Sequence, residues 1–233
     1  MKIQSAKTSA DIPERLLSLD VFRGITIAGM ILVNNAGDWA HVYAPLRHAR
    51  WHGWTVADLV FPFFVFILGS AIPLALGRRL DTGAPRNRVA LSVLRRTMVL
   101  LALGFVLNLL PDFDFATVRI PGVLQRIGLC YLAGSLVFIM TRRPALWCAI
   151  ALMLMAAHWA VLALLPVPGF GAGVLDPLGN AARYIDGTLF AGHTYRHAPA
   201  VGFDPEGLPG TLSAAVPGSA GARLTGSPST SIF

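Results

Sequence analysis

Hydrophobic residues gather into five long runs that short polar stretches separate. Each run is close to the ~20 residues that a helix needs to cross the hydrocarbon core of a bilayer. The predicted spans are residues 19–36, 54–76, 89–110, 122–140 and 145–165. The first span is the weakest, because its purely apolar core is as short as that of a signal peptide. No obvious A-x-A cleavage site follows it, so we interpret it as an uncleaved helix. The pattern predicts an all-α, polytopic transmembrane helix bundle of about five spans.

The arginines predict how the bundle is oriented. Four of them lie between the second and third spans, and Arg142 and Arg143 lie between the fourth and fifth. Loops rich in Lys and Arg stay in the cytoplasm. We therefore expect a cytoplasmic N-terminal lead (1–18), a transmembrane region (19–165) and an outer loop (37–53) on the opposite face. Residues 166–206 would form a second outer loop, and the low-complexity tail, 207–233, is expected to be disordered.

Composition supports a membrane protein and excludes other classes. Mean hydropathy is +0.61 and only 13% of residues are charged, well below the quarter usual in soluble domains. The net charge of +7 is almost all arginine placed in short loops, which indicates membrane topology and no nucleic-acid partner. Cys130 and Cys148 fall inside apolar runs, so we expect packing residues and no disulfide or metal site.

The candidate chemistry precedes and enters the second span. His48 and His52, with two tryptophans and an arginine, stand directly before it, and Asp58 lies one turn inside. An aromatic belt would explain the tryptophans, but it leaves Asp58 unexplained, and ionisable groups within a span mark functional sites. The histidines have metal-ligand spacing on a helix, yet no third ligand is suitably placed. We therefore expect no metal, and a histidine acting as general base or nucleophile.

Other polar residues recur at similar depths in the spans. Asn34, with Asn35 beside it, and Asn108 lie near the outer ends of the first and third spans, and Gln125 and Arg126 near the start of the fourth. Amides at such depth either join helices or hold a substrate. Arg126 is expected to face the bundle interior and meet an anion, either Asp58 or a ligand.

A second polar pair lies at the opposite end of the first span. Asp20 and Arg23 share one helix face there. They form either a snorkelling arginine with a helix-start aspartate, or a contact to a polyanionic ligand from the cytoplasm.

Four segments in order, 17–24, 33–37, 48–66 and 120–127, resemble the heparan-α-glucosaminide N-acetyltransferase family, including its bacterial members. The resemblance covers about residues 16–206. It implies a polytopic enzyme that moves an acetyl group from cytoplasmic acetyl-CoA to a sugar amine on the outer or lumenal face. The family's active-site histidine matches His48, and its essential asparagine matches Asn34. The resemblance also implies a truncated N-terminal half, which we expect to be inactive alone.

Taken together, these patterns predict a membrane-bound acetyltransferase fragment of the bacterial inner membrane. His48, Asn34 and Asp58 are the expected catalytic residues. Residues expected to bind the acyl donor, acetyl-CoA, or the sugar acceptor are Arg126, Gln125, Asn108, Asp20, Arg23 and His52. Whether His48 acts as a base or carries the acetyl group stays open, as does homo-oligomer formation. The alternatives are a polytopic transporter, which would suit intramembrane Asp58 and Arg126 equally well, and a non-catalytic membrane subunit.

Overall fold

The computed structural model describes residues 17–35, 37–110, 113–211 and 214, and none of them forms a β-strand. Five helices in this part of the chain are long and apolar enough to cross a membrane, as predicted. They are α1 (Leu17–Asn34), α2 (Val56–Ile72) with its extension to Asp81, α4 (Arg86–Leu109), α5 (Val123–Met140) and α6 (Pro144–Leu164). Each begins and ends within a few residues of the predicted run, apart from the longer end of α2. The chain is thus a multi-pass, all-α membrane protein.

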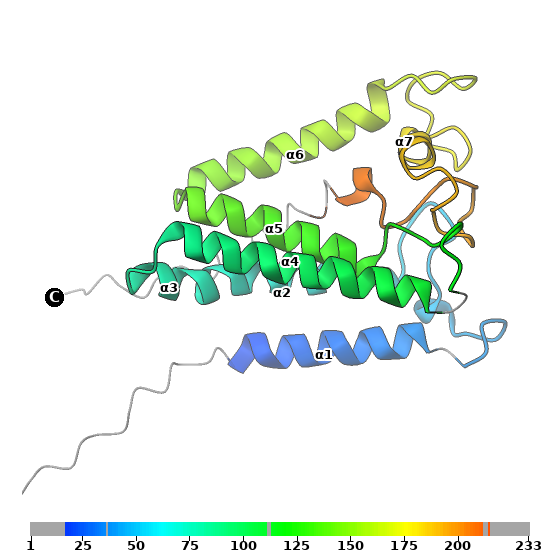
Figure 1. Ribbon diagram of the computed structural model, residues 1–233. Helices are drawn as coiled ribbons and strands as arrows, with labels where there is room; N and C mark the ends of the chain where they lie inside the picture. Colours follow the sequence, from blue (N-terminus) through cyan, green and yellow to red (C-terminus); the bar gives the residue numbers. More distant parts are fainter. Residues whose placement is uncertain (1–16, 36, 111–112, 212–213, 215–233) are drawn as a thin grey trace, which may run out of the picture.

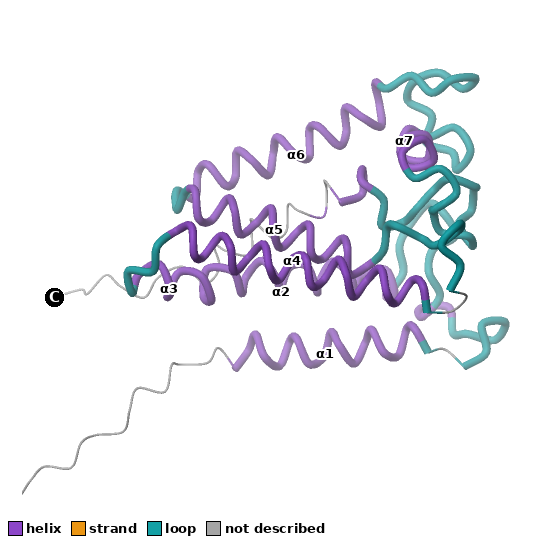
Figure 2. Tube along the Cα trace, in the orientation of Figure 1, coloured by secondary structure: helices purple, strands orange, loops and turns teal. Residues whose placement is uncertain are grey.

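The long helices lie side by side with their connections at two ends (Figure 1). Helix α5 packs against both α4 and α2, and α1 packs against α2. We call the end at which α1 stops and α2 starts the loop end, because the longest non-helical segments gather there (Figure 2). The other end, where the turns carry Arg86 and Arg142, is called the arginine end. The predicted alternation of loops between two faces is therefore present.

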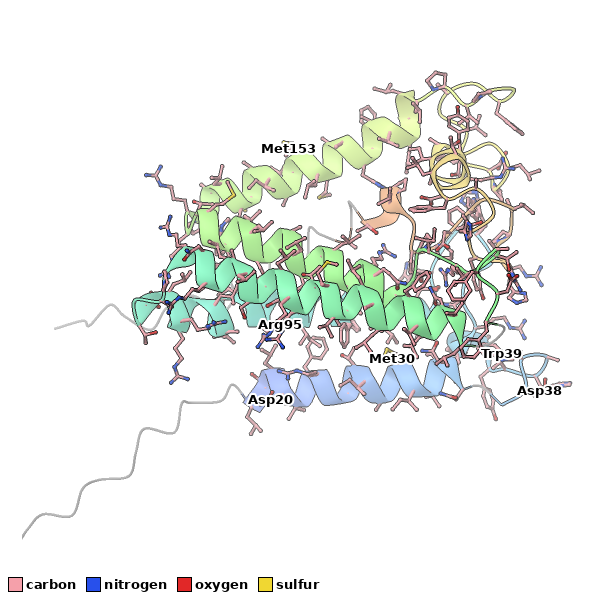
Figure 3. All side chains as sticks on the ribbon, in the orientation of Figure 1. Asp20, Met30, Asp38, Trp39, Arg95 and Met153 are labelled. Atoms are coloured by element: carbon pink, nitrogen blue, oxygen red, sulfur yellow. The ribbon has the colours of Figure 1, made fainter. Side chains whose placement is uncertain are left out.

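The outer surfaces of the bundle are apolar, as a lipid environment requires. Helix α1 buries only Thr26 and Val33, and α6 buries only Trp147. Met153 of α6 is 61% exposed and lies on the flank of the bundle (Figure 3). On α4, Arg95 lies on the side that faces α1 (Figure 3). The main core cluster lies toward the arginine end and includes Ile72, Leu76, Val89, Val93, Tyr131, Phe138 and Trp147.

The second span runs five residues further than predicted. After Ile72 the chain makes a π-helical turn, Pro73–Gly77, and continues as α3 (Arg78–Asp81). Pro73 has no N–H to donate within the helix, and a π turn accommodates the lost hydrogen bond. The added turn places Arg78 and Arg79 beyond the apolar part of the helix, where their charged groups can reach water.

Two segments predicted without structure contain helices. The segment 166–206, predicted as an outer loop, includes α7 (Ala181–Leu189), and a 3₁₀ turn, Ala44–Leu46, lies in the loop 37–53. Disorder was expected from residue 207, but Leu208–Thr211 and residue 214 are helical, and Ala214 is 9% exposed against Val65 and Cys130. The expectation is wrong for these residues, because contacts from α5, α6 and α7 fix a segment whose composition alone favours disorder. The rest of the tail and the lead 1–16 lie outside the described residues.

Candidate active site

A histidine and an aspartate meet at the loop end. Nδ1 of His48 lies 2.7 Å from Oδ1 of Asp58, in the first turn of α2. A carboxylate only accepts hydrogen bonds, so Nδ1 carries a proton, and in the neutral form of the ring Nε2 then has the free lone pair. The His48 side chain is 56% exposed while that of Asp58 is 28% exposed. The Asp58 carboxylate therefore fixes the orientation of an imidazole that is more than half exposed.

Asp58 also fixes the loop that carries His48. Its second oxygen, Oδ2, accepts the N–H of Ala49 at 3.1 Å, the N–H of Thr55 at 2.9 Å and the Thr55 hydroxyl at 3.1 Å. The Thr55 hydroxyl lies 2.8 Å from the carbonyl of Arg47 as well. Thr55 precedes the helix and Asp58 is its third residue, which is the spacing of a capping box. One carboxylate therefore starts α2 and holds the histidine loop against it.

Trp51 pins the same loop from the other side. Its indole N–H donates to the carbonyl of Leu175 at 2.8 Å, and its ring centroid lies 4.9 Å from that of Phe203, edge to face. Both partners belong to the segment that follows α6 at the loop end. His52, the second predicted histidine, is exposed and its ring contacts Trp51, with centroids 6.5 Å apart. Hydrogen bonds thus hold the His48 and Trp51 side chains of this loop, whereas the His52 ring contacts that of Trp51.

The two asparagines at the end of α1 differ in what they contact. Asn35 donates from Nδ2 to the carbonyl of Ile31 at 2.8 Å, which satisfies one of the last carbonyls of the helix. Asn34 is the last residue of α1 and its side chain is exposed at the loop end. Asn35 is therefore engaged in ending the helix, which favours Asn34 as the asparagine with a chemical role.

Arg126 faces the bundle interior, as expected, but it meets backbone and not Asp58. Its guanidinium donates to the carbonyls of Pro205 at 3.1 Å and Gly210 at 2.7 Å, and stacks 4.6 Å from the ring centroid of Phe61. Its Nε is buried without a hydrogen-bond partner. The arginine thereby holds the start of the helical segment at 208 inside the bundle.

Gln125 and Asn108 lie at the contact between α4 and α5. Gln125 is 9% exposed, and its Nε2 is buried without a hydrogen-bond partner. Asn108 donates from Nδ2 to the carbonyls of Arg119 at 2.9 Å and Pro121 at 3.2 Å. The side-chain amide of Asn108 therefore orders the loop that leads into α5.

The remaining predicted pair lies far from this site. Asp20 and Arg23 form an ion pair of 3.0 Å near the start of α1, and both side chains are partly exposed. Asp20 lies at the arginine end of α1 (Figure 3). Any ligand that they contact would approach from the face opposite His48.

A buried ionic cluster that the sequence did not predict joins the segment before α5 to the segment after α7. Arg119 donates to Asp204 through Nε at 2.9 Å and Nη2 at 2.5 Å, and also to Glu206. Burial alone would lower the pKa of Arg119, but the bonds and charges of the two carboxylates outweigh it and raise the pKa above its ordinary value. The side chain of Asp204 is fully buried. Arg119 and Asp204 are 85 positions apart, so no local sequence pattern could predict that they pair.

Asp186 of α7 is buried beside the same turn. Its Oδ1 accepts the N–H of Leu208 at 3.0 Å, while Oδ2 has no hydrogen-bond partner. Burial raises the pKa of Asp186 to about 6, the bond from Leu208 opposes the shift, and the charge of Asp204 adds to it. A β-carbon at Gly207 would lie 1.8 Å from Oδ2, so this close approach requires glycine.

Sequence reasoning missed Thr55, although a signal was available. The spacing Thr55-x-x-Asp58 before an apolar run is a capping box with aspartate in place of glutamate. Among the described residues, no group of three or more His, Cys, Asp or Glu side chains could hold a metal ion. The chemistry available here is that of an imidazole oriented by a carboxylate.

Comparison with known proteins identifies the family. Residues 15–180 match the family model described as heparan-alpha-glucosaminide N-acetyltransferase, catalytic. The human heparan-alpha-glucosaminide N-acetyltransferase is 34% identical over 88% of this chain, and the mouse protein is 30% identical over 90%. The aligned regions cover 37% and 38% of those relatives, so the chain spans little more than a third of their length. With most of its length matched, the chain belongs to the heparan-alpha-glucosaminide N-acetyltransferase family.

Proposed function

We propose that this chain provides the histidine-bearing part of a membrane acetyltransferase that uses acetyl-CoA and acetylates a sugar amine or hydroxyl. The observation that carries the proposal is the His48–Asp58 contact of 2.7 Å at the mouth of α2. A histidine oriented by a carboxylate is the arrangement that activates nucleophiles in acyl transfer. The arginine end would face the cytoplasm of a bacterial cell and the loop end the outside.

The proposed reaction joins the acceptor nitrogen or oxygen to the acetyl carbonyl carbon and breaks the carbon–sulfur bond of the thioester. His48 accepts the proton of the acceptor at Nε2, and the departing thiolate is protonated to coenzyme A. In the second route, Nε2 first attacks the thioester and carries the acetyl group to the acceptor. Asp58 stabilises the positive imidazole in either route.

Asn34 is proposed to stabilise the negative charge on the carbonyl oxygen during transfer. An amide N–H aimed at a developing oxyanion typically contributes ~10²–10³-fold to the rate. The position of Asn34 at the loop end of α1, next to an Asn35 engaged with the helix backbone, supports this role. Arg126 is proposed to act through the segment 205–210 that it holds, and Gln125 through the contact between α4 and the start of α5.

The test is turnover of acetyl-CoA with glucosamine as acceptor, followed through the released thiol in the protein that carries this chain. His48→Ala is expected to lower the rate by roughly 10²-fold or more, because base and acyl carrier are both lost. His41→Ala is the matched control, since His41 also pairs with an aspartate, Asp38, in the same loop, at 2.5 Å.

His52→Ala is expected to have a milder effect than His48→Ala, because the His52 side chain is exposed beside Trp51. Equal turnover in the His48 and His41 variants would refute the assignment of His48. A protein that moves a solute without consuming acetyl-CoA would support the transporter alternative.

A further inference from the structure

A cavity of about 210 Å³ opens at the arginine end, away from the candidate active site. It lies between the two short connections at that end, the one from α3 to α4 and the one from α5 to α6. Its polar lining consists of Arg86, Thr141 and Arg142, and its apolar lining includes Leu80, Ile139 and Met140. The cavity therefore has basic and apolar walls in one space.

The basic wall retains a positive excess. Arg142 is held in place, since Nη1 donates to Oδ1 of Asp81 at 2.7 Å and its guanidinium lies 5.6 Å from the ring centroid of Phe138. Arg86 lines the cavity from the first residue of α4. Residues 78–88 and 141–143 together contain six arginines and one aspartate, so pairing with Asp81 leaves most of the positive charge uncompensated.

The apolar wall indicates that the anion bound in the cavity also carries an apolar part. Met140 is the last residue of α5 and is 78% exposed on the surface of a membrane-spanning helix. Leu80 and Ile139 belong to the ends of spans as well. A free phosphate would make no favourable contact with these apolar side chains. In a phospholipid, the phosphate is joined through glycerol to apolar acyl chains, so one molecule can contact both the basic and the apolar wall.

We propose that this cavity binds the headgroup phosphate of an anionic phospholipid of the cytoplasmic leaflet. Arg86 and Arg142 face the phosphate, and Met140 and Ile139 lie beside the glycerol and the first carbons of the acyl chains. Basic pockets between helices on the cytoplasmic side are suited to anionic headgroups, and each nearby arginine contributes about fivefold to lipid affinity. The proposal is independent of the reaction proposed above and rests only on the proposed orientation of the arginine end.

The experiment compares two double variants with the same net charge. Arg86→Gln with Arg142→Gln removes the two guanidinium groups that line the cavity. Arg88→Gln with Arg143→Gln removes two neighbouring arginines, one in the first turn of α4 and one directly before α6, that are not part of its lining. The protein is reconstituted in vesicles of phosphatidylcholine mixed with phosphatidylglycerol, extracted, and weighed by native mass spectrometry to count retained phosphatidylglycerol.

We expect retained phosphatidylglycerol to fall about fivefold for each cavity arginine removed, with the control variant binding like the wild type. An equal loss in both variants would overturn the proposal, because it would mean a diffuse attraction of the whole basic end. Displacement of the lipid by inorganic phosphate or adenosine 3′,5′-bisphosphate would also overturn it, since the cavity would then take a soluble phosphate. Circular dichroism in pure phosphatidylcholine checks that both variants keep the wild-type helix content.

Discussion

Asp58 and Asp186 show how the surroundings of a carboxylate decide its role. Asp58 accepts hydrogen bonds from His48, Ala49 and Thr55, and these donors stabilise its negative charge. Asp186 receives one N–H, from Leu208, and keeps an oxygen without a partner in a buried position. A buried carboxyl with so few donors is more stable in its neutral form. The first residue is suited to chemistry, and the second to a structural contact that depends on pH.

Asp186→Asn is expected to raise thermal stability at neutral pH. Burial raises the pKa of Asp186 to about 6 from an ordinary 3.8. Between these two pH values the folded state keeps a proton that the unfolded state has lost. The contribution of Asp186 to stability is then present below pH ~4 and declines as pH rises through 6. At pH 7.5 the variant is expected to melt roughly 4 °C above the wild type or more, because ~1 kcal/mol moves the midpoint of a chain this size by ~2–4 °C.

The measurement is the melting midpoint of both proteins in detergent at pH 4.5 and pH 7.5. The difference between them should be small at the lower pH. A wild type that gains stability over the variant as pH rises would contradict the expectation, because it would mean that the folded protein favours the ionised carboxylate.

At the scale of elements, the contact between α4 and α5 depends on glycines that leave room for a larger side chain. A β-carbon at Gly104 of α4 would lie 2.4 Å from Oε1 of Gln125, and one at Gly122 would lie 2.6 Å from the same atom. Small residues allow membrane helices to approach closely. Gly104 and Gly122 therefore leave the space in which the Gln125 side chain packs between α4 and the start of α5.

Gly104→Ala is expected to destabilise the bundle by roughly 1–3 kcal/mol, because Gln125 must move within a packed contact. Gly24→Ala in α1 is the control: nothing lies within 4 Å of the added carbon, and alanine is the better helix former. Thermal unfolding in detergent compares the two. A loss of stability in both variants alike would show that the Gln125 contact is not the cause.

The elements that could be predicted are those whose signal is local. Each long apolar run became a helix, because a bilayer leaves a run of that length few other structures. The helical turn at Leu208 was missed, since the residues that hold it, Arg126, His158 and Asp186, are distant in the sequence. Helix α7 was missed as well, and its Asp186 accepts the N–H of Leu208, 22 positions later.

The candidate site likewise has a part that the sequence predicted and a part that it did not. The positions of His48 and Asp58 before and inside the second span indicated a site there. By contrast, the Trp51–Leu175 and Arg119–Asp204 contacts join residues too far apart for any pattern to connect them.

At the scale of the whole molecule, the two ends of the bundle carry different chemistry. The loop end is ordered by hydrogen bonds between side chains and backbone, and it holds the His48–Asp58 pair. The arginine end consists of short turns with exposed guanidinium groups. This polarity matches the charge bias of cytoplasmic loops and supports a fixed orientation in the membrane.

Cysteine labelling is expected to show that orientation. Arg50→Cys, in the loop before α2, should react with a membrane-impermeant maleimide on intact bacterial cells. Thr82→Cys, in the turn between α3 and α4, should react only after the cells are permeabilised. The native Cys130 is buried and Cys148 lies in a span, so the wild type measures the background. The reverse labelling pattern would invert the proposed topology.

The anchoring of Trp51 also sets an order of events during synthesis. The His48–Asp58 pair spans only ten residues, so it is able to form as soon as α2 enters the membrane. The carbonyl that fixes Trp51 belongs to Leu175, 124 residues later, and emerges from the ribosome only after three further spans have been made. The histidine loop therefore reaches its final form only after α4, α5 and α6 have been made.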